Sequence, residues 1–184
     1  MKKLILLYVI LFTVFALGCG GGGSSSLVGP EITYADNTKL ADEYPVVNTN
    51  YGSVRNIMSS SATTDTERRD LVNDLLFYFS DEFKDKAGNF AKDKIQTTTL
   101  DYLKQYTLSS YNFSPVIKGG VGHDYNEATG ILTVKTLISI SAVANTGSMD
   151  INVSKVFDIE WKELSEDNWV IVGGFPTTKA ELGL

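Results

Sequence analysis

His123 and Asp124 are the residues of this sequence whose types and spacing come closest to a catalytic pair. A histidine titrates near neutral pH and often serves as a general base beside a carboxylate. His123 is the only histidine in the sequence, and Asp124 is its direct neighbour. Adjacent residues of a strand point to opposite faces of a sheet, so the two side chains cannot pair directly there. We therefore expect a solvated pair at a strand end, and the sequence predicts no catalytic residue.

Thr136 and Lys155 form the second candidate, because each interrupts an otherwise apolar strand face. If the two residues lie opposite each other on neighbouring strands, a hydroxyl and an ammonium meet on the concave side of the sheet. A buried lysine needs a carboxylate partner or an anionic ligand, so this pair predicts a ligand-binding site. The alternative, which we favour for the lysine, is that Lys155 packs its stem and extends its ammonium to the sheet edge.

Motifs for metal, phosphate and cofactor binding are incomplete in this sequence. The glycines at 119, 120 and 122 lack the lysine and the strand-to-helix context of a phosphate loop. The segment from Asp124 to Ala128 begins like a calcium loop but lacks the third ligand and the closing glutamate. One histidine and one cysteine do not suffice for a structural zinc site. We expect no metal and no cofactor.

Two long runs, residues 131–143 and 149–162, alternate between apolar and polar side chains, as strands of a half-buried antiparallel sheet do. The even-numbered apolar set is Leu132, Val134, Ile138, Ile140 and Ala142, and the odd-numbered set is Met149, Ile151, Val153, Phe157, Ile159 and Trp161. The two apolar faces coincide only if an even residue opposes an odd one. We favour the register with Asn145 and Thr146 in a two-residue turn, because it sets Thr136 opposite Lys155.

Further strands are predicted on both sides of this hairpin. A turn at residues 166–168 leads into a strand ending at Phe175, in which Gly173 and Gly174 indicate a bulge or a close backbone approach. Before the hairpin, residues 111–125 form a strand interrupted by Pro115 and by glycines, followed by a turn at residues 126–130.

Helices are predicted before these strands. Thr64 and Glu67 fit a capping box, and apolar residues then recur at three- and four-residue spacing as far as Phe83. We expect this helix to end near residues 88–89 and a second helix to begin at Thr98. The preceding stretch, residues 31–61, is expected to be an irregular or partly helical arm.

The first 19 residues resemble a bacterial lipoprotein signal. Two lysines precede an apolar run from Leu4 to Leu17, and the sequence Phe-Ala-Leu-Gly-Cys at residues 15–19 resembles a lipobox, with alanine where leucine is commoner. This resemblance implies a signal peptide over residues 1–18 and a lipid on Cys19. Residues 19–30, rich in glycine and serine, would then form a flexible tether. The implied location is the bacterial cell envelope, at the outer membrane in a Gram-negative cell.

The composition of the sequence limits which partners the remaining domain, residues 31–184, is expected to bind. The formal net charge is −6, and loss of Lys2 and Lys3 with a signal peptide would make it more negative. An acidic chain without a basic cluster is not expected to bind nucleic acid, or to bind a membrane other than through the lipid. With Cys19 as the only cysteine, no intrachain disulfide can form.

The order of two helices, a strand and a three-strand meander resembles the NTF2-like (cystatin-related) fold over residues 64–175. The resemblance rests on this order and on the last strand, which carries Trp169. It implies an α+β domain in which helices pack on a curved antiparallel sheet of about four strands, around a cone-shaped cavity. Members of this family include enzymes, small-molecule binders and protein-association modules, so the fold does not select among them.

Three functions stay open at this point. We favour a non-enzymatic, lipid-anchored envelope module that binds a small molecule or a protein. The first alternative is an isomerase or cyclase that uses an aspartate or histidine in the cavity. The second is a purely structural envelope lipoprotein. An open apolar cavity would favour ligand binding, converging ionisable groups would favour an enzyme, and a filled cavity would favour a structural or protein-binding role.

Overall fold

The computed structural model of the chain describes residues 34–145, 147 and 149–183. The predicted signal peptide (1–18), the predicted lipidation site Cys19 and the predicted tether (19–30) lie outside the described residues. None of the helices within this part of the chain has the length and apolar content that crossing a membrane requires.

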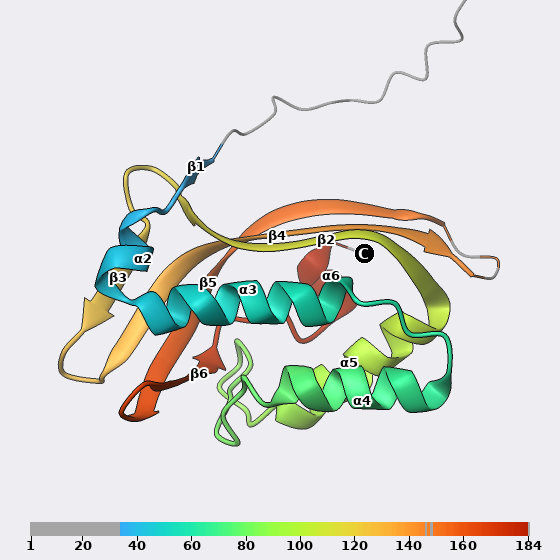
Figure 1. Cartoon of the computed structure of the whole chain (residues 1–184), viewed down its shortest axis with the longest axis horizontal. Helices are drawn as coiled ribbons and strands as arrows, with labels where there is room; N and C mark the ends of the chain where they lie inside the picture. Colours follow the sequence, from blue (N-terminus) through green and yellow to red (C-terminus); the bar gives the residue numbers. More distant parts are fainter. Residues whose placement is uncertain (1–33, 146, 148, 184) are drawn as a thin grey trace, which may run out of the picture. The chain divides into compact units, whose positions relative to one another are not determined.

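An antiparallel sheet of six strands forms one layer of the domain (Figure 1). The strands are β1 (Ala35–Asp36), β2 (Tyr106–Ile117), β3 (His123–Asn126), β4 (Ile131–Ala144), β5 (Ile151–Ser165) and β6 (Asn168–Gly173). Their order is β1-β2-β4-β5-β6, and β3 pairs with the part of β4 that β2 leaves free. The α+β class is thus confirmed, but the expected number of about four strands is too low.

The extra strands have two origins. The single strand expected over residues 111–125 is two strands, because Gly119 and Gly120 take positive φ angles of 62° and 80° and turn the chain between them. Both β2 and β3 then pair with β4, one after the other along its length. The second extra strand, β1, has only two residues and pairs with the end of β2.

The register of the β4–β5 hairpin differs from the favoured one by two residues. Thr136 lies opposite Phe157, and Lys155 lies opposite Ile138, so the predicted Thr136–Lys155 pairing is wrong. The even-to-odd pairing of apolar residues is confirmed. Asn145 explains the shift, because its side chain accepts a hydrogen bond from Thr107 and its backbone N–H donates to Gln105. These bonds hold Asn145 against β2 and α5 instead of in a two-residue turn.

The alternation of buried and exposed residues along β4 and β5 follows the prediction. All five apolar residues predicted for the inner face of β4 are buried, and so are Ile151, Phe157, Ile159 and Trp161 of β5. Val153 is partly buried. Met149 differs, because it precedes β5 in the hairpin loop and its side chain is exposed.

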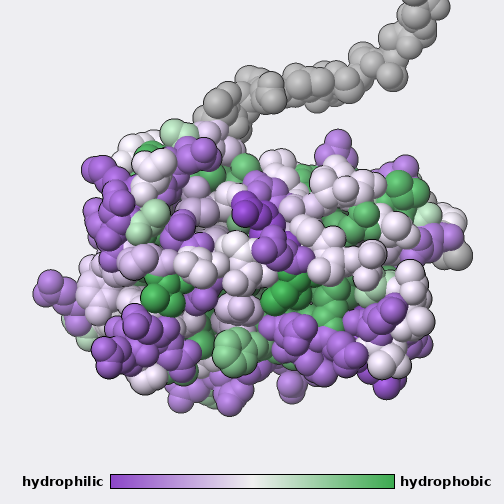
Figure 2. All heavy atoms as spheres, viewed as in Figure 1, coloured by the Kyte–Doolittle hydropathy of each residue, from purple (hydrophilic) through white to green (hydrophobic). Residues whose placement is uncertain are grey.

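Within the described residues, five helices accompany the sheet: α2 (Lys39–Glu43), α3 (Pro45–Ser59), α4 (Asp65–Leu76), α5 (Lys92–Gln105) and α6 (Lys179–Leu182). Figure 1 shows β4 and β5 curving over α3, with α4 and α5 on the other side of α3. Hydrophilic residues cover much of the face seen in Figure 2, between separate smaller hydrophobic patches. The core therefore lies between the sheet and the helices, and it includes residues of α3, α4 and α5.

Helix α3 lies within the stretch that was expected to be irregular or only partly helical. Pro45 stands in its first turn, where the missing N–H of proline costs no hydrogen bond. Its buried residues, Val47, Tyr51, Val54 and Met58, follow one another at four-, three- and four-residue spacing. That spacing is typical of one face of a helix, so the signal was present among many polar residues.

Helix α4 begins as predicted and ends earlier than predicted. The capping box of Thr64 and Glu67 is present, and its hydrogen bonds lower the pKa of Glu67 to about 2. The helix ends at Leu76 rather than near residues 88–89. Beyond it, the backbone pairs with the outer edge of β6: Ile171 N–H donates to Tyr78, and Ser80 N–H donates to Ile171. Those bonds replace the helical ones.

Helix α5 begins earlier than predicted, at Lys92 rather than Thr98. Thr98 does not cap a helix, because its hydroxyl donates a 2.9 Å hydrogen bond to the carbonyl oxygen of Thr177. This bond connects α5 to the segment before α6, so the threonine contributes to tertiary structure instead.

Candidate functional site

Thr136 belongs to a closed hydrogen-bond network inside the core. Its side-chain oxygen lies 2.6 Å from the hydroxyl of Tyr51 and 3.1 Å from the Val134 carbonyl oxygen. The indole N–H of Trp161 donates to the same Tyr51 hydroxyl at 3.2 Å. Thr136 and Trp161 are both fully buried. The network satisfies its own polar groups, so it offers no free group to a ligand.

Lys155 lies on the inner face by parity but is exposed. Its ammonium donates a 2.7 Å hydrogen bond to the carbonyl oxygen of Glu181 and lies 5.7 Å from the centre of the Phe157 ring. The Lys155 side chain thus packs its aliphatic part against the protein and extends its ammonium toward solvent, as favoured from the sequence. Lys155 thus contacts the C-terminal segment, and the structure does not bring it together with Thr136.

His123 is less solvated than expected, with 11% of its side chain exposed. The amide nitrogen of Asn37 lies 3.0 Å from Nδ1, and Glu43 Oε2 lies 2.8 Å from Nε2. The ring also packs edge-on against Tyr44 at 5.6 Å between centroids. Both ring nitrogens are therefore engaged, and they connect β3 to the α2 region. Asp124 is exposed and does not pair with this ring.

An apolar pocket of about 50 Å³ opens between the helices, the sheet and the C-terminal segment. Its walls include Met58 of α3, Ile95 and Tyr102 of α5, Tyr111 of β2 and Ile138 of β4. Phe175, Pro176, Lys179 and Leu182 complete it from the C-terminal side. Elements far apart in the sequence therefore build this pocket together.

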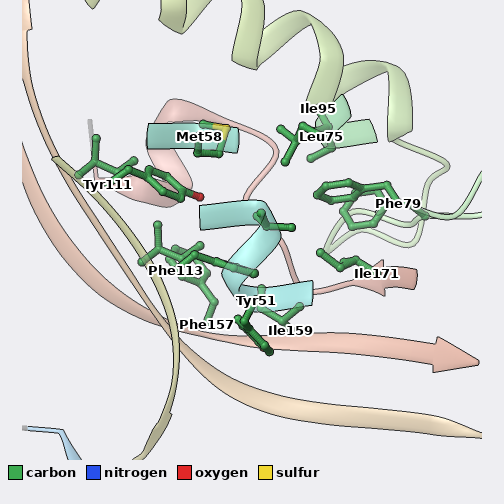
Figure 3. Close-up of a cluster of buried hydrophobic side chains, with 14 of the residues drawn as sticks. Tyr51, Met58, Leu75, Phe79, Ile95, Tyr111, Phe113, Phe157, Ile159 and Ile171 are labelled. Carbon is green, nitrogen blue, oxygen red and sulfur yellow. The ribbon is translucent and has the colours of Figure 1, made fainter. Parts of the chain in front are cut away.

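Tyr111 supplies a hydroxyl to this pocket. Figure 3 shows its ring extending from β2 toward the interior, with the hydroxyl oxygen turned toward α3. Burial raises the pKa of the Tyr111 phenol, and the neighbouring Tyr102 adds to the effect. The group stays protonated at neutral pH, so it can donate a hydrogen bond to an acceptor in the pocket.

The hydroxyl of Tyr102 differs from that of Tyr111. It is fully buried and has no hydrogen-bond partner among residues 34–145, 147 and 149–183. Burial raises the pKa of the Tyr102 phenol, with a smaller contribution from Tyr106, whose ring stacks on it at 5.3 Å. Both tyrosines line the pocket, but the hydroxyl of Tyr102 is closed off from solvent.

The segment from Phe175 to Leu182, named the C-terminal cap below, closes one side of the pocket. Polar contacts hold it in place. Thr98 donates to the Thr177 carbonyl oxygen at 2.9 Å, Lys155 donates to that of Glu181 at 2.7 Å, and Lys179 donates to Gln105 Oε1 at 2.7 Å. The ring of Phe175 also packs against those of Phe79 and Phe113, at 5.0 Å and 6.0 Å between centroids, so the cap is part of the core as well.

Sequence reasoning missed the pocket residues Tyr102, Tyr111 and Lys179. The alternation of Tyr111 with Phe113 along β2 was a readable signal for burial. No local pattern could show that the hydroxyl of Tyr111 faces α3, since that depends on how α3, α5 and β2 pack together.

Comparison of the chain with protein-family models, with curated proteins and with solved structures gave no match. The site must therefore be interpreted from its own geometry.

Proposed function

We propose that this protein is a non-enzymatic binding module of the bacterial cell envelope, and that its apolar pocket takes a small ligand with one hydrogen-bond acceptor. The observation that carries the proposal is the Tyr111 hydroxyl in the mainly apolar wall between helices and sheet. Apolar pockets with few polar groups are typical of small-molecule sites. A volume of about 50 Å³ admits only a small molecule or the end of a larger one.

The isomerase or cyclase alternative has less support from the same pocket. It requires an aspartate or histidine among the reacting groups, whereas the ionisable side chains of the wall are Tyr102, Tyr111 and Lys179. Burial raises the pKa of both tyrosines, so neither serves as a base near neutral pH. The contacts of His123 with Asn37 and Glu43 lie elsewhere in the fold.

An NTF2-like architecture is part of the proposal. It is supported by the order of α3, α4 and α5 before the main strands, by the curvature of β4 and β5 over α3, and by the last strand carrying Trp169 (Figure 1). In that architecture, the space between helices and sheet is where a ligand would enter. Most of that space is filled here by core side chains, and the pocket behind the C-terminal cap is what remains.

Tyr111→Phe tests the ligand site. We expect this change to weaken binding of cyclopentanone roughly 2- to 12-fold, which is the effect of losing one hydrogen bond worth about 0.5–1.5 kcal/mol. Binding is measured by NMR titration, with cyclopentane as the hydrocarbon lacking an acceptor. Tyr102→Phe is the matched control, because its hydroxyl is fully buried and should not reach the ligand. Equal binding of ketone and hydrocarbon by the wild type would contradict the proposal.

Cys19→Ser tests the membrane anchor. The motive is the resemblance of residues 15–19 to a lipobox, because the sulfur of Cys19 would carry the lipid. When the protein is expressed in a bacterium with labelled palmitate, the wild type should incorporate the label and move to the membrane fraction. The Cys19→Ser variant should remain unlabelled. Equal labelling of the two proteins would exclude lipidation at this residue.

A further inference from the structure

A second pocket, separate from the apolar one, lies where the α3–α4 loop meets the start of β2 and the β4–β5 hairpin (right in Figure 1). Its volume is about 370 Å³, within the range of small-molecule sites. Ser59 to Thr63 form one wall, and Leu103, Tyr106 and Leu108 form another. Among the described residues of the lining, Arg68 supplies the only charge. We name it the Arg68 pocket.

The guanidinium of Arg68 has few partners for its degree of burial. Only 18% of the side chain is exposed, and Nη1 donates a 2.9 Å hydrogen bond to Asp65, an exposed residue one turn earlier in α4. The Nε–H group is buried and has no hydrogen-bond partner within the described part of the chain. A guanidinium offers five N–H donors and binds carboxylates through pairs of them. The Nε–H group therefore lacks an acceptor, and because it is closed off from solvent, a ligand reaches it only after the Arg68 side chain shifts.

Three hydroxyl groups near the Arg68 guanidinium already donate hydrogen bonds to other residues. The hydroxyl of Thr63 donates to Glu67, and that of Thr107 donates to Asn145. Ser60 donates to the Asn56 carbonyl oxygen. No acidic side chain lines the Arg68 pocket in the part of the chain that the structure describes. None of these hydroxyl groups accepts a hydrogen bond from the Arg68 Nε–H group in this structure, so an acceptor on a ligand can serve it.

We infer that the Arg68 pocket binds a small organic monocarboxylate with an apolar body. The planar carboxylate matches the guanidinium fork, and the wall of Leu103, Tyr106 and Leu108 accepts the apolar part. The hydroxyls of Ser59 and Ser61 line the same pocket and can donate to the carboxylate. Asp65 and Glu67 stand beside the pocket, and the net charge of the chain is −6, so repulsion disfavours ligands with several negative charges.

The test compares phenylacetate with its neutral analogue phenylacetamide, by calorimetry and by NMR titration of the full chain. Phenylacetate should bind at least about tenfold more tightly, as a charge-assisted bidentate contact predicts. Arg68→Gln should abolish this preference. Arg69→Gln is the matched control, because Arg69 lies in the same helix with the same charge but is exposed and does not line the pocket.

Two further measurements decide the outcome if Arg68→Gln folds poorly. In the wild type, the Nε–H resonance of Arg68 should shift on addition of phenylacetate, and Arg68→Lys should retain the charge preference only in part. Binding of cyclopentanone in the apolar pocket should be unchanged by phenylacetate, which separates this inference from the proposed function. No binding of phenylacetate, equal binding of the amide, or an equal loss in Arg69→Gln would overturn the inference.

Discussion

Gly174→Ala is expected to lower the free energy of unfolding by about 2–5 kcal/mol. Gly174 has a φ of 77°, a left-handed conformation that costs other residues about 1–2 kcal/mol. In addition, a Cβ there would overlap the carbonyl oxygen of Asp158 and lie 2.8 Å from its carbonyl carbon. Both belong to the backbone of β5, which can move only with the sheet, and such overpacking costs about 1–3 kcal/mol more.

Gly173→Ala is the control for this prediction. A Cβ at Gly173 would meet the carboxylate end of Glu160, a flexible side chain that can turn away, and no positive φ adds strain. Its cost should stay near 1 kcal/mol or below. Urea denaturation of both variants and the wild type measures the difference. Similar losses for the two glycines would show that the close approach of Gly174 to β5 is not what stabilises this bulge.

Leu75→Ala should also destabilise the domain by about 2–5 kcal/mol, the range for buried leucines. Leu75 is fully buried in α4 and belongs to the same core cluster as Ile138, Ile140 and Phe157. Figure 3 shows it beside Ile95 of α5, with Phe79 nearby. Truncation would leave a cavity between the two helices that the surrounding side chains cannot fully close.

Leu76→Ala provides the comparison, since it makes the same truncation one residue later, at a partly buried position. We expect it to cost less than half as much as Leu75→Ala, because part of the side chain already contacts water. The free energy of unfolding of both variants is measured by chemical denaturation, followed by tryptophan fluorescence. A loss below about 0.5 kcal/mol for Leu75→Ala would mean that α4 does not pack on the core through this residue.

The strands could be predicted because their signal is local. In β4 and β5, each side chain reports its face through the alternation of apolar and polar residues. The same pattern limited the pairing to even residues opposite odd ones, which the structure confirms. It could not select among the registers that satisfy this rule. Asn145 makes the selection through hydrogen bonds to Thr107 and Gln105, which are distant in sequence.

Phe79 and Phe83 show how a correct signal led to an incorrect element. Their spacing from Leu75 predicted burial, and both are buried, but they lie beyond the end of α4. The backbone there bonds to β6 instead of continuing the helix. The spacing of apolar residues indicates which side chains are buried. It indicates the backbone conformation only where no strand edge competes for the backbone hydrogen bonds.

The candidate sites could not be predicted from the sequence. Thr136 and Lys155 were selected from an assumed register, and a shift of two residues separates them. Tyr111 and Arg68 carry no motif, since a tyrosine in a strand and an arginine in a helix are common. They become candidates only because α3, α5, β2 and, for Tyr111, the C-terminal cap place them beside pockets.

By itself, the sequence of this protein determined the α+β class, the faces of β4 and β5, and the capping box that begins α4. Each depends on residues within a few positions of one another, whose side-chain directions follow from the local backbone geometry. Only the tertiary structure decided the hairpin register, the end of α4 and the two pockets. These depend on hydrogen bonds and contacts between distant segments, such as Ile171 with Tyr78 or Thr98 with Thr177. Such contacts exist only after the chain has closed its loops around the core.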